Sequence, residues 1–247
     1  PGHSSAASDV YKRQFFEGIK YRAVDNYEEA IVSFEASLSF IPTNDAAHYE
    51  LAVIYFKELD FNRADYHLTQ ALLIDPNNTW YMGFLAEIYV GNNKLREAVD
   101  LFENLHEMEP SKRSHLNNIA IVELMLRDTL SALDSYGEYV ERYGLDDEVY
   151  GPYTEVLKEQ RAWADMEELS KRCFIERGGS PQSFQDHLAA LIYQGKDDAV
   201  EAWLEKGKET KELAPAVVDF SANRALSKGD ITSCLLYTSP SPRDGRI

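Results

Sequence analysis

The sequence has few cysteines, few glycines and no long apolar run, and each shortage argues against a class of protein. It contains two cysteines and 13 glycines, and no stretch approaches the ~20 apolar residues of a membrane-spanning helix. No glycine-rich phosphate loop, Gly-x-Ser-x-Gly elbow or cysteine-nucleophile motif occurs. We therefore expect no transmembrane segment, no cofactor and no catalytic site.

Positive charge is also scarce. The chain has 25 Lys and Arg against 42 Asp and Glu, a net charge of −17. Because an acidic surface repels phosphate backbones, we do not expect nucleic acid as a direct partner. The simpler interpretation of the charge is a solvated surface, and the alternative is an acidic patch that faces a basic partner.

The two ends of the chain can be encoded by DNA sequences that are nearly reverse complements of each other. Residues 9–14 can be written as GATGTGTATAAGAGACAG and residues 234–239 as TGTCTCTTATACACATCT, which overlaps the reverse complement of the first. The ends resemble translated transposase-adapter DNA, so we expect 1–14 and 234–247 to be non-native and the natural termini to be missing. The compartment therefore stays open between bacterial cytoplasm and periplasm.

The remaining cysteine and the histidines show no pattern of chemistry. Cys173 is the single cysteine of residues 15–233, which excludes a disulfide there, and a lone thiol in an apolar stretch is typical of packing. No histidine stands in a metal-binding spacing, so we expect surface histidines and no metal site. The histidines of this range are His48, His67, His106, His115 and His187.

A pattern of small residues and prolines recurs at a spacing of 34 residues, which is typical of arrays of helix-turn-helix repeats. Small residues allow two helices to approach closely where they cross, and proline ends a helix. Aromatic residues at Tyr21, Tyr55 and Tyr89 are expected to fill the space between repeats. The recurring small residues and prolines are Gly18, Ala52 and Ala86, then Ala30, Ala64 and Ala98, then Pro42, Pro76 and Pro110.

These motifs resemble those of the tetratricopeptide repeat family. The resemblance implies an all-α fold, a right-handed α-solenoid of helix-turn-helix repeats. Repeats 1–3 match well over 15–112, and repeats 4–6 are degenerate over 113–206, with Glu123 at the tyrosine position and Met166 at a small position. Residues 207–233 are expected to hold the first helix of a truncated seventh repeat, with a turn at Gly229-Asp230 and an uncovered apolar face.

In this family the first helices line a concave groove, so the resemblance also implies candidate groove residues. Tyr49, Phe56 and Trp80 have an alternative interpretation, as packing against neighbouring first helices. Asn117 and Asn118 are expected either to hold the backbone of an extended segment or to be solvated. The candidates are Tyr49, Val53, Phe56, Lys57, Trp80, Glu87, Val90, Asn117, Asn118, Ile121 and Leu124, with Glu50 and Met125 beside them.

One subclass of the family, the carboxylate clamp that binds chaperone tails, does not match. It needs lysine, arginine and asparagine at places where this chain has Phe15, Ile19, Glu50, Gly83 and Glu87. Without cations to pair with a terminal carboxylate, we do not expect chaperone-tail binding.

The sequence therefore predicts a protein-protein interaction scaffold that binds a peptide or helix of an unidentified partner in the groove. The alternative is that the repeats are the docking or regulatory region of a larger bacterial enzyme or sensor, with the catalytic domain outside this chain.

The repeat register makes a prediction about stability. Ala64→Leu should overpack the helix crossing and lower the free energy of unfolding by roughly 1 to 3 kcal/mol. Chemical denaturation measures the change, with Ala202→Leu as a control outside the crossing positions. An unchanged midpoint for Ala64→Leu would mean that the register is wrong.

Overall fold

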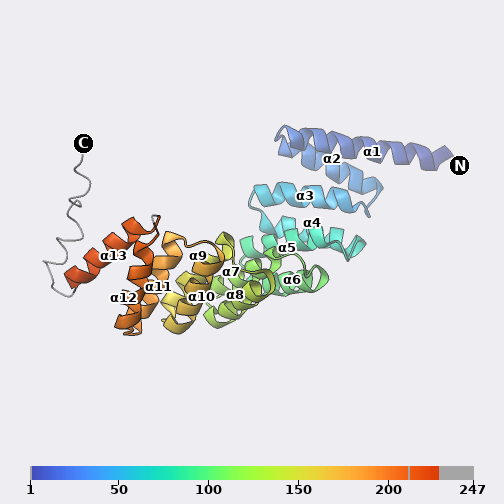
Figure 1. The fold of residues 1–247 in the computed structure, drawn as a ribbon. Helices are drawn as coiled ribbons and strands as arrows, with labels where there is room; N and C mark the ends of the chain where they lie inside the picture. Colours follow the sequence, from blue (N-terminus) through green and yellow to red (C-terminus); the bar gives the residue numbers. More distant parts are fainter. Residues whose placement is uncertain (1, 211, 228–247) are drawn as a thin grey trace, which may run out of the picture. The chain divides into compact units, whose positions relative to one another are not determined.

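The computed structural model describes residues 2–210 and 212–227, and in these ranges it consists of helices and the turns between them (Figure 1). No strand occurs among the described residues. The helices are α1 (Gly2–Ala23), α2 (Tyr27–Phe40), α3 (Asp45–Lys57), α4 (Phe61–Ile74), α5 (Thr79–Gly91), α6 (Leu95–Met108), α7 (Ser114–Met125), α8 (Thr129–Tyr143), α9 (Asp147–Glu159), α10 (Trp163–Glu176), α11 (Pro181–Tyr193), α12 (Asp197–Lys208) and α13 (Ala214–Ser227).

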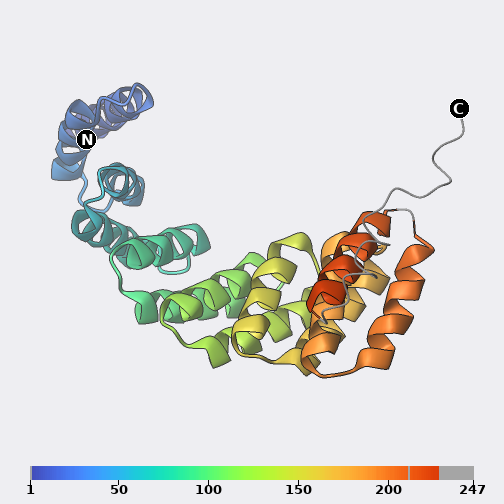
Figure 2. The same ribbon diagram turned by 90° about the vertical axis from the view of Figure 1, so that its left-hand side faces the viewer.

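The chain divides into two compact bodies. The N-terminal body is Pro1–Tyr143, with α1–α8, and the C-terminal body is Gly144–Ile247, with α9–α13. Within the N-terminal body each helix packs against the next one in the chain, and Figure 2 shows them as successive helical hairpins. The predicted all-α repeat fold is confirmed. The predicted seventh-repeat turn at Gly229-Asp230 lies outside the described residues.

The predicted crossing residues lie in the core. Ala30, Ala52, Ala64, Ala86 and Ala98 are all fully buried. At Gly18 an added Cβ would lie 2.7 Å from the Phe34 ring, which is closer than real Cβ contacts allow. The small side chains therefore set how closely the two helices of a repeat approach, as the register predicts. Residues 2–14 belong to α1, and this does not test the predicted origin of that segment.

Each repeat turns between its two helices with the same backbone conformation. One residue per turn has a positive φ, and these residues are Asp25, Leu59, Asn93, Arg127, Arg161 and Gly195, which follow one another at a spacing of 34. The next residue is the N-cap of the second helix, and Asn26 and Asp60 accept a backbone N–H there. Asn44 and Asn78 cap first helices in the same way.

The predicted role of Tyr21 needs a correction. Tyr21 is 38% exposed, so it does not fill the space between repeats. Tyr55 is buried, but it stacks on His67 of the same repeat, with ring centroids 5.5 Å apart. The Arg63 guanidinium lies 4.2 Å from the centroid of the Tyr55 ring. Tyr55 therefore packs against the second helix of its own repeat, and it belongs to a core that also includes residues of the neighbouring repeats.

Glu123 takes the tyrosine position in the fourth repeat and is buried. Ser135 on the second helix donates a hydrogen bond to its carboxylate at 2.7 Å. Burial raises the pKa of Glu123, and the Ser135 hydrogen bond opposes this change. A polar pair therefore replaces the aromatic contact at this crossing.

The helix crossings of the fifth and sixth repeats differ from those of repeats 1–4. Thr154 and Met166 occupy the small positions of the fifth repeat, and Leu188 and Val200 those of the sixth. All four are buried, and the paired helices make less extensive contact than those of repeats 1–4. Larger side chains at the crossing hold the helix backbones apart.

Polar groups partly replace apolar packing in the C-terminal body. Asp186 is buried on α11, accepts a hydrogen bond from the Tyr150 hydroxyl at 2.9 Å and forms an ion pair with Lys158 at 3.0 Å. Burial and the nearby carboxylate raise the pKa of Tyr150 well above its usual value. Ser180 caps α11 and Pro181 begins it, as the sequence predicts.

The turn geometry generates a prediction. Leu59 has a φ of 61° and is 72% exposed. Its side chain therefore contributes little packing energy to offset the strain of its backbone conformation. Leu59→Gly should raise the free energy of unfolding by about 0.5 to 1 kcal/mol. The converse change at the equivalent position, Gly195→Ala, should lower it by about 1 kcal/mol. Thermal unfolding measures both, and opposite signs to these would contradict the proposed turn strain.

Candidate functional site

One concave pocket of the N-terminal body is a cavity of about 540 Å³ lined mainly by three consecutive first helices. The helices α3 and α5 supply most of its walls, and α7, the segment before it and Phe102 of α6 supply the rest. Its lining residues are Tyr49, Val53, Phe56, Lys57, Thr79, Trp80, Gly83, Phe84, Glu87, Phe102, Lys112, Ser114, His115 and Asn118. We call this cavity the first-helix pocket.

Helical periodicity places the lining residues of each helix on one face. On α5, Trp80, Phe84 and Glu87 follow at spacings of four and three residues, which share one side of a helix. Asn78 caps this helix by accepting the Tyr81 backbone N–H at 3.2 Å, which fixes where the helix begins. The position of the N-cap and the helical period together therefore determine which face of α5 lines the pocket.

Aromatic rings form the floor of the first-helix pocket. Phe84 on α5 contacts Phe56 and Tyr49 on α3 edge to face, with ring centroids 5.2 Å and 5.8 Å apart. Tyr49 also stacks on Tyr81 at 5.4 Å. The Trp80 indole N–H donates a hydrogen bond to the Tyr49 hydroxyl at 3.0 Å. These contacts join α3 to α5 and hold the rings in place.

Trp80 keeps most of its surface in water despite these contacts. The residue is 69% exposed, which is unusual for a large aromatic side chain in a folded protein. Its hydrogen bond to Tyr49 orients the indole without covering its faces. The pocket thus presents an oriented, accessible aromatic surface.

A polar network built around Glu109 forms the third wall. Its carboxylate accepts hydrogen bonds from Thr79 at 3.2 Å and Lys112 at 2.9 Å, and it lies 3.1 Å from the ring nitrogen Nε2 of His115. The Lys112 hydrogen bond is the main cause that lowers the pKa of Glu109. The network ties the start of α5 to the start of α7 and engages the ammonium group of Lys112.

Glu87 is the other acidic group at the first-helix pocket. Desolvation alone raises the pKa of its carboxyl group. Lys57 lines the same cavity, but its ammonium group donates to the Tyr27 hydroxyl at 3.3 Å. In the part of the chain that the structure describes, Glu87 has neither a hydrogen bond nor an ion pair from its carboxylate.

Seven of the eleven residues predicted for the groove line this pocket. Val90, Ile121 and Leu124 do not line it, and Asn117 is buried, which excludes its predicted solvated role and leaves Asn118 at the pocket wall. The seven are Tyr49, Val53, Phe56, Lys57, Trp80, Glu87 and Asn118. Whether they bind a peptide stays a prediction.

Sequence reasoning missed Phe84, the ring at the centre of the floor. It stands at the sixth position of its repeat, the position that also holds Glu50 and Asn118. The same rule applied to the third repeat identifies it. Tyr49 and Phe56 do pack on the neighbouring first helix through Phe84, as their alternative interpretation has it, whereas Trp80 stays largely exposed.

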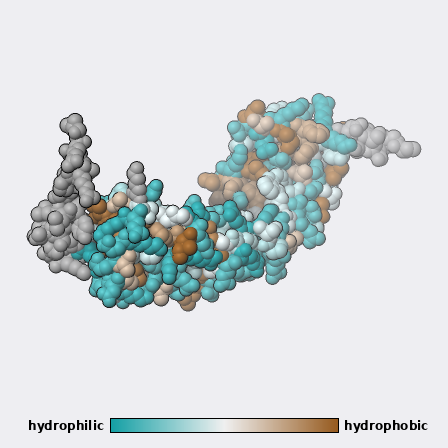
Figure 3. All heavy atoms as spheres, viewed as in Figure 1, coloured by the Kyte–Doolittle hydropathy of each residue, from teal (hydrophilic) through white to brown (hydrophobic). Residues whose placement is uncertain are grey.

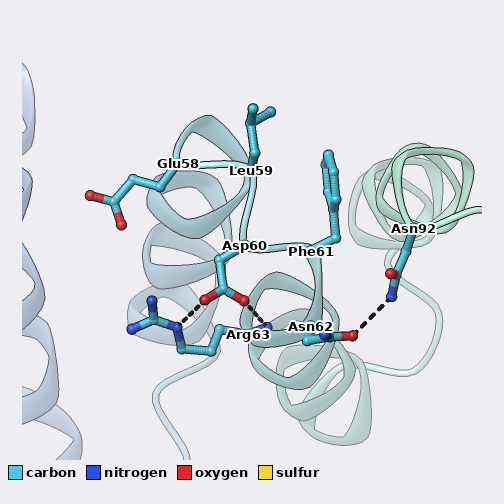
Figure 4. Close-up of a pocket in the computed structure, with 7 residues that line it drawn as sticks. All are labelled: Glu58, Leu59, Asp60, Phe61, Asn62, Arg63 and Asn92. Atoms are coloured by element: carbon cyan, nitrogen blue, oxygen red, sulfur yellow. Dashed lines mark hydrogen bonds and ion pairs between the residues drawn. The ribbon is translucent and has the colours of Figure 1, made fainter.

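A second depression, of about 500 Å³, lies at the turn between α3 and α4 and is shown in Figure 4. Its polar groups are engaged with one another. Asp60 accepts hydrogen bonds from the backbone and side chain of Arg63 at 3.0 and 2.5 Å, and Asn92 donates to Asn62 at 3.2 Å. These bonds cap α4 and join two neighbouring turns. The depression is therefore explained by helix capping.

The prediction of surface histidines is wrong for three of the five. His48, His115 and His187 are buried. The Nδ1 atoms of His48 and His67 are 3.1 Å apart, although 19 residues separate them. Nε2 of His48 lies 3.2 Å from the Pro42 carbonyl, which can only accept, so it carries the proton and His67 donates to His48. Among the described residues no group of three or more His, Cys, Asp and Glu side chains could hold a metal ion.

Comparison with known proteins identifies the fold. No family model matches the chain. Over 117 residues it is 25% identical to anaphase-promoting complex subunit 3 of Schizosaccharomyces pombe, and the match covers 47% of this chain and 18% of that protein. The chain thus spans about a fifth of the length of this curated relative.

Solved structures resemble it over a greater length. A tetratricopeptide repeat protein from Parabacteroides merdae gives a TM-score of 0.58 at 15% identity and covers 93% of this chain and 91% of its own. PilF of Pseudomonas aeruginosa gives 0.52 at 17%, covering 88% and 99%. A structure of Naa15/Naa10 bound to HypK-THB gives 0.58 at 13%, covering 95% and 37%. The chain is an all-α repeat protein, and its fold is that of the tetratricopeptide repeat, which its 34-residue signature fits. None of the described helices is long and apolar enough to span a membrane.

The histidine pair generates a prediction of pH dependence. Burial, followed by His48 and Arg63, lowers the pKa of His67 to about 4, and the unfolded chain should have an ordinary value of about 6.5. The unfolded state then binds more protons between these values, so stability should fall as the pH falls from about 6.5 towards 4. We expect a loss of about 1 to 2 kcal/mol from His67 between pH 7.5 and pH 5.

Urea denaturation at several pH values measures this loss, and His67→Gln provides the comparison. The variant keeps every carboxylate of the wild type, so the difference between the two pH profiles isolates the imidazole. Parallel profiles would contradict a proton-sensitive role for His67.

Proposed function

We propose that the N-terminal body binds a peptide or helix of a partner protein in the first-helix pocket, and that the chain acts as a non-enzymatic interaction scaffold. The observation that carries the proposal is the exposed, oriented indole of Trp80 at a concave site. Exposed aromatic anchors beside a shaped apolar pocket are the usual centres of protein interfaces.

Further exposed apolar groups on α7 support a segment longer than one side chain. Ile121 is 43% exposed and Met125 is 49% exposed, and the two are four residues apart on one face of the helix. Both stand at positions that the family resemblance assigns to the groove. Binding would cover them together with Trp80.

The fold comparison agrees with this proposal without identifying a partner. The Naa15/Naa10 structure, which is similar in fold, is bound to HypK-THB. For this chain, a terminal carboxylate is a poor candidate ligand. Glu50 occupies one of the places where a clamp needs asparagine, and its carboxylate pairs with Arg22 at 2.6 Å.

The face in Figure 3 carries separate hydrophobic patches on a largely hydrophilic surface. Exposed apolar side chains are ordinary on proteins when they stand alone. The first-helix pocket differs because its apolar groups converge on a cavity.

Two aromatic truncations test the proposal. Trp80→Ala should abolish partner capture and change stability by less than about 1 kcal/mol, because the indole is mostly exposed. Phe56→Ala should lower stability by roughly 2 kcal/mol, because the ring packs between α3 and α5. Affinity purification from the source proteome, combined with thermal unfolding, measures both effects.

Tyr66→Ala is the matched control for the exposed aromatic. Tyr66 is 59% exposed on α4 and does not line the pocket, so its loss should leave capture unchanged. Capture that survives Trp80→Ala, or that is lost equally in Tyr66→Ala, would exclude the first-helix pocket as the binding site.

A further inference from the structure

We propose that the first-helix pocket receives a positively charged side chain, an arginine or lysine of the partner, which lies against the Trp80 ring and pairs with Glu87. This inference rests on the proposed function and specifies the chemistry of the anchor residue. It follows from the charged side chains of the pocket and from which of them already have a partner.

The three charged side chains that line the cavity differ in whether their charged group already has a partner. Lys57 donates to the Tyr27 hydroxyl at 3.3 Å, and its ammonium group lies 5.6 Å from the centroid of that ring. Lys112 donates to Glu109 at 2.9 Å. Both cations of the cavity are therefore engaged with groups outside it. Glu87 has no such partner among the described residues.

The surroundings of Glu87 favour a cation. Trp80 and Phe84 stand seven and three residues before it on the same face of α5, so aromatic surface and carboxylate face the same cavity. A guanidinium or ammonium group is attracted to the face of an aromatic ring, most strongly to tryptophan. It also pairs with a carboxylate, and arginine does both through its planar group.

The net charge of the chain also favours a basic anchor residue. The full chain carries a net charge of −17, so a basic segment would be drawn to it over a long range. Desolvation acts against the charge on Glu87 in the free protein. The attraction of a cation for the carboxylate would offset this effect, whereas an acidic or purely apolar side chain would not.

Selection of random dodecapeptides displayed on phage, with the full chain as bait, tests the inference. Peptides that bind the wild type but not Trp80→Ala should be enriched in arginine or lysine. Replacing that residue by citrulline, which keeps the shape of arginine and removes its charge, should weaken binding about tenfold. Fluorescence anisotropy of the synthetic peptides measures the affinities.

Variants of the carboxylate connect the preference to one residue. Glu87→Gln should weaken the arginine peptide about tenfold and remove most of the difference between arginine and citrulline. Glu87→Lys should select acidic residues instead. Glu107→Gln, an exposed glutamate on α6 outside the pocket, is the matched control and should bind as the wild type does. Thermal unfolding confirms that each variant is folded.

The outcomes separate this inference from the proposed function. Trp80-dependent peptides without basic enrichment, or with equal affinity for wild type and Glu87→Gln, would overturn the cationic anchor and leave the binding site standing. If no selected peptide depends on Trp80, the proposed function fails and the anchor fails with it.

Discussion

The close approach of two helices at a pair of small residues is the contact on which the rest of the N-terminal body depends. Ala52, Ala64, Ala86 and Ala98 are fully buried at these crossings, and at Gly18 an added Cβ would clash with the Phe34 ring. This contact sets the crossing of each hairpin, and the hairpins then pack on one another through the larger residues around it. Because the first helices repeat at the same spacing, their faces align into one concave surface, and the first-helix pocket is part of that surface.

Much of this architecture is predictable from the sequence because its causes are local and periodic. Alanines and prolines act on residues a few places away, so their 34-residue spacing predicts the helical hairpins of the first three repeats. The less extensive helix contacts of the fifth and sixth repeats follow from the size of residues such as Met166 and Leu188 at the small positions.

The features that escaped prediction depend on neighbours that are distant in sequence. His48 and His67 have no motif in common, and they meet because α4 folds back along α3. Tyr55 has a predictable burial but not a predictable partner, since the choice between its own repeat and the next depends on the geometry of the crossing. The solvated alternative for Asn117 fails for the same reason, because which side of α7 faces the core depends on α8.

The same distinction between local and long-range causes applies to the candidate site. The family positions predict which side chains of α3, α5 and α7 face the groove, and seven of them line one cavity. The sequence does not show which charges in that cavity are already paired. Lys57 finds its partner 30 residues away at Tyr27 and Lys112 finds one at Glu109, whereas Glu87 finds none among the described residues. Pairing of this kind is decided by reach and direction in three dimensions.

The repeated left-handed residue at positions such as Leu59 and Asn93 has a consequence for how the chain folds. Because each hairpin closes through its own turn and packs mainly on its sequence neighbours, nearly all native contacts join residues within two repeats. Chains of low contact order form their structure quickly and can lose it piecewise. The repeats at one end can therefore unfold while the hairpins around the first-helix pocket stay folded. The stability of the pocket thus depends mainly on the repeats next to it.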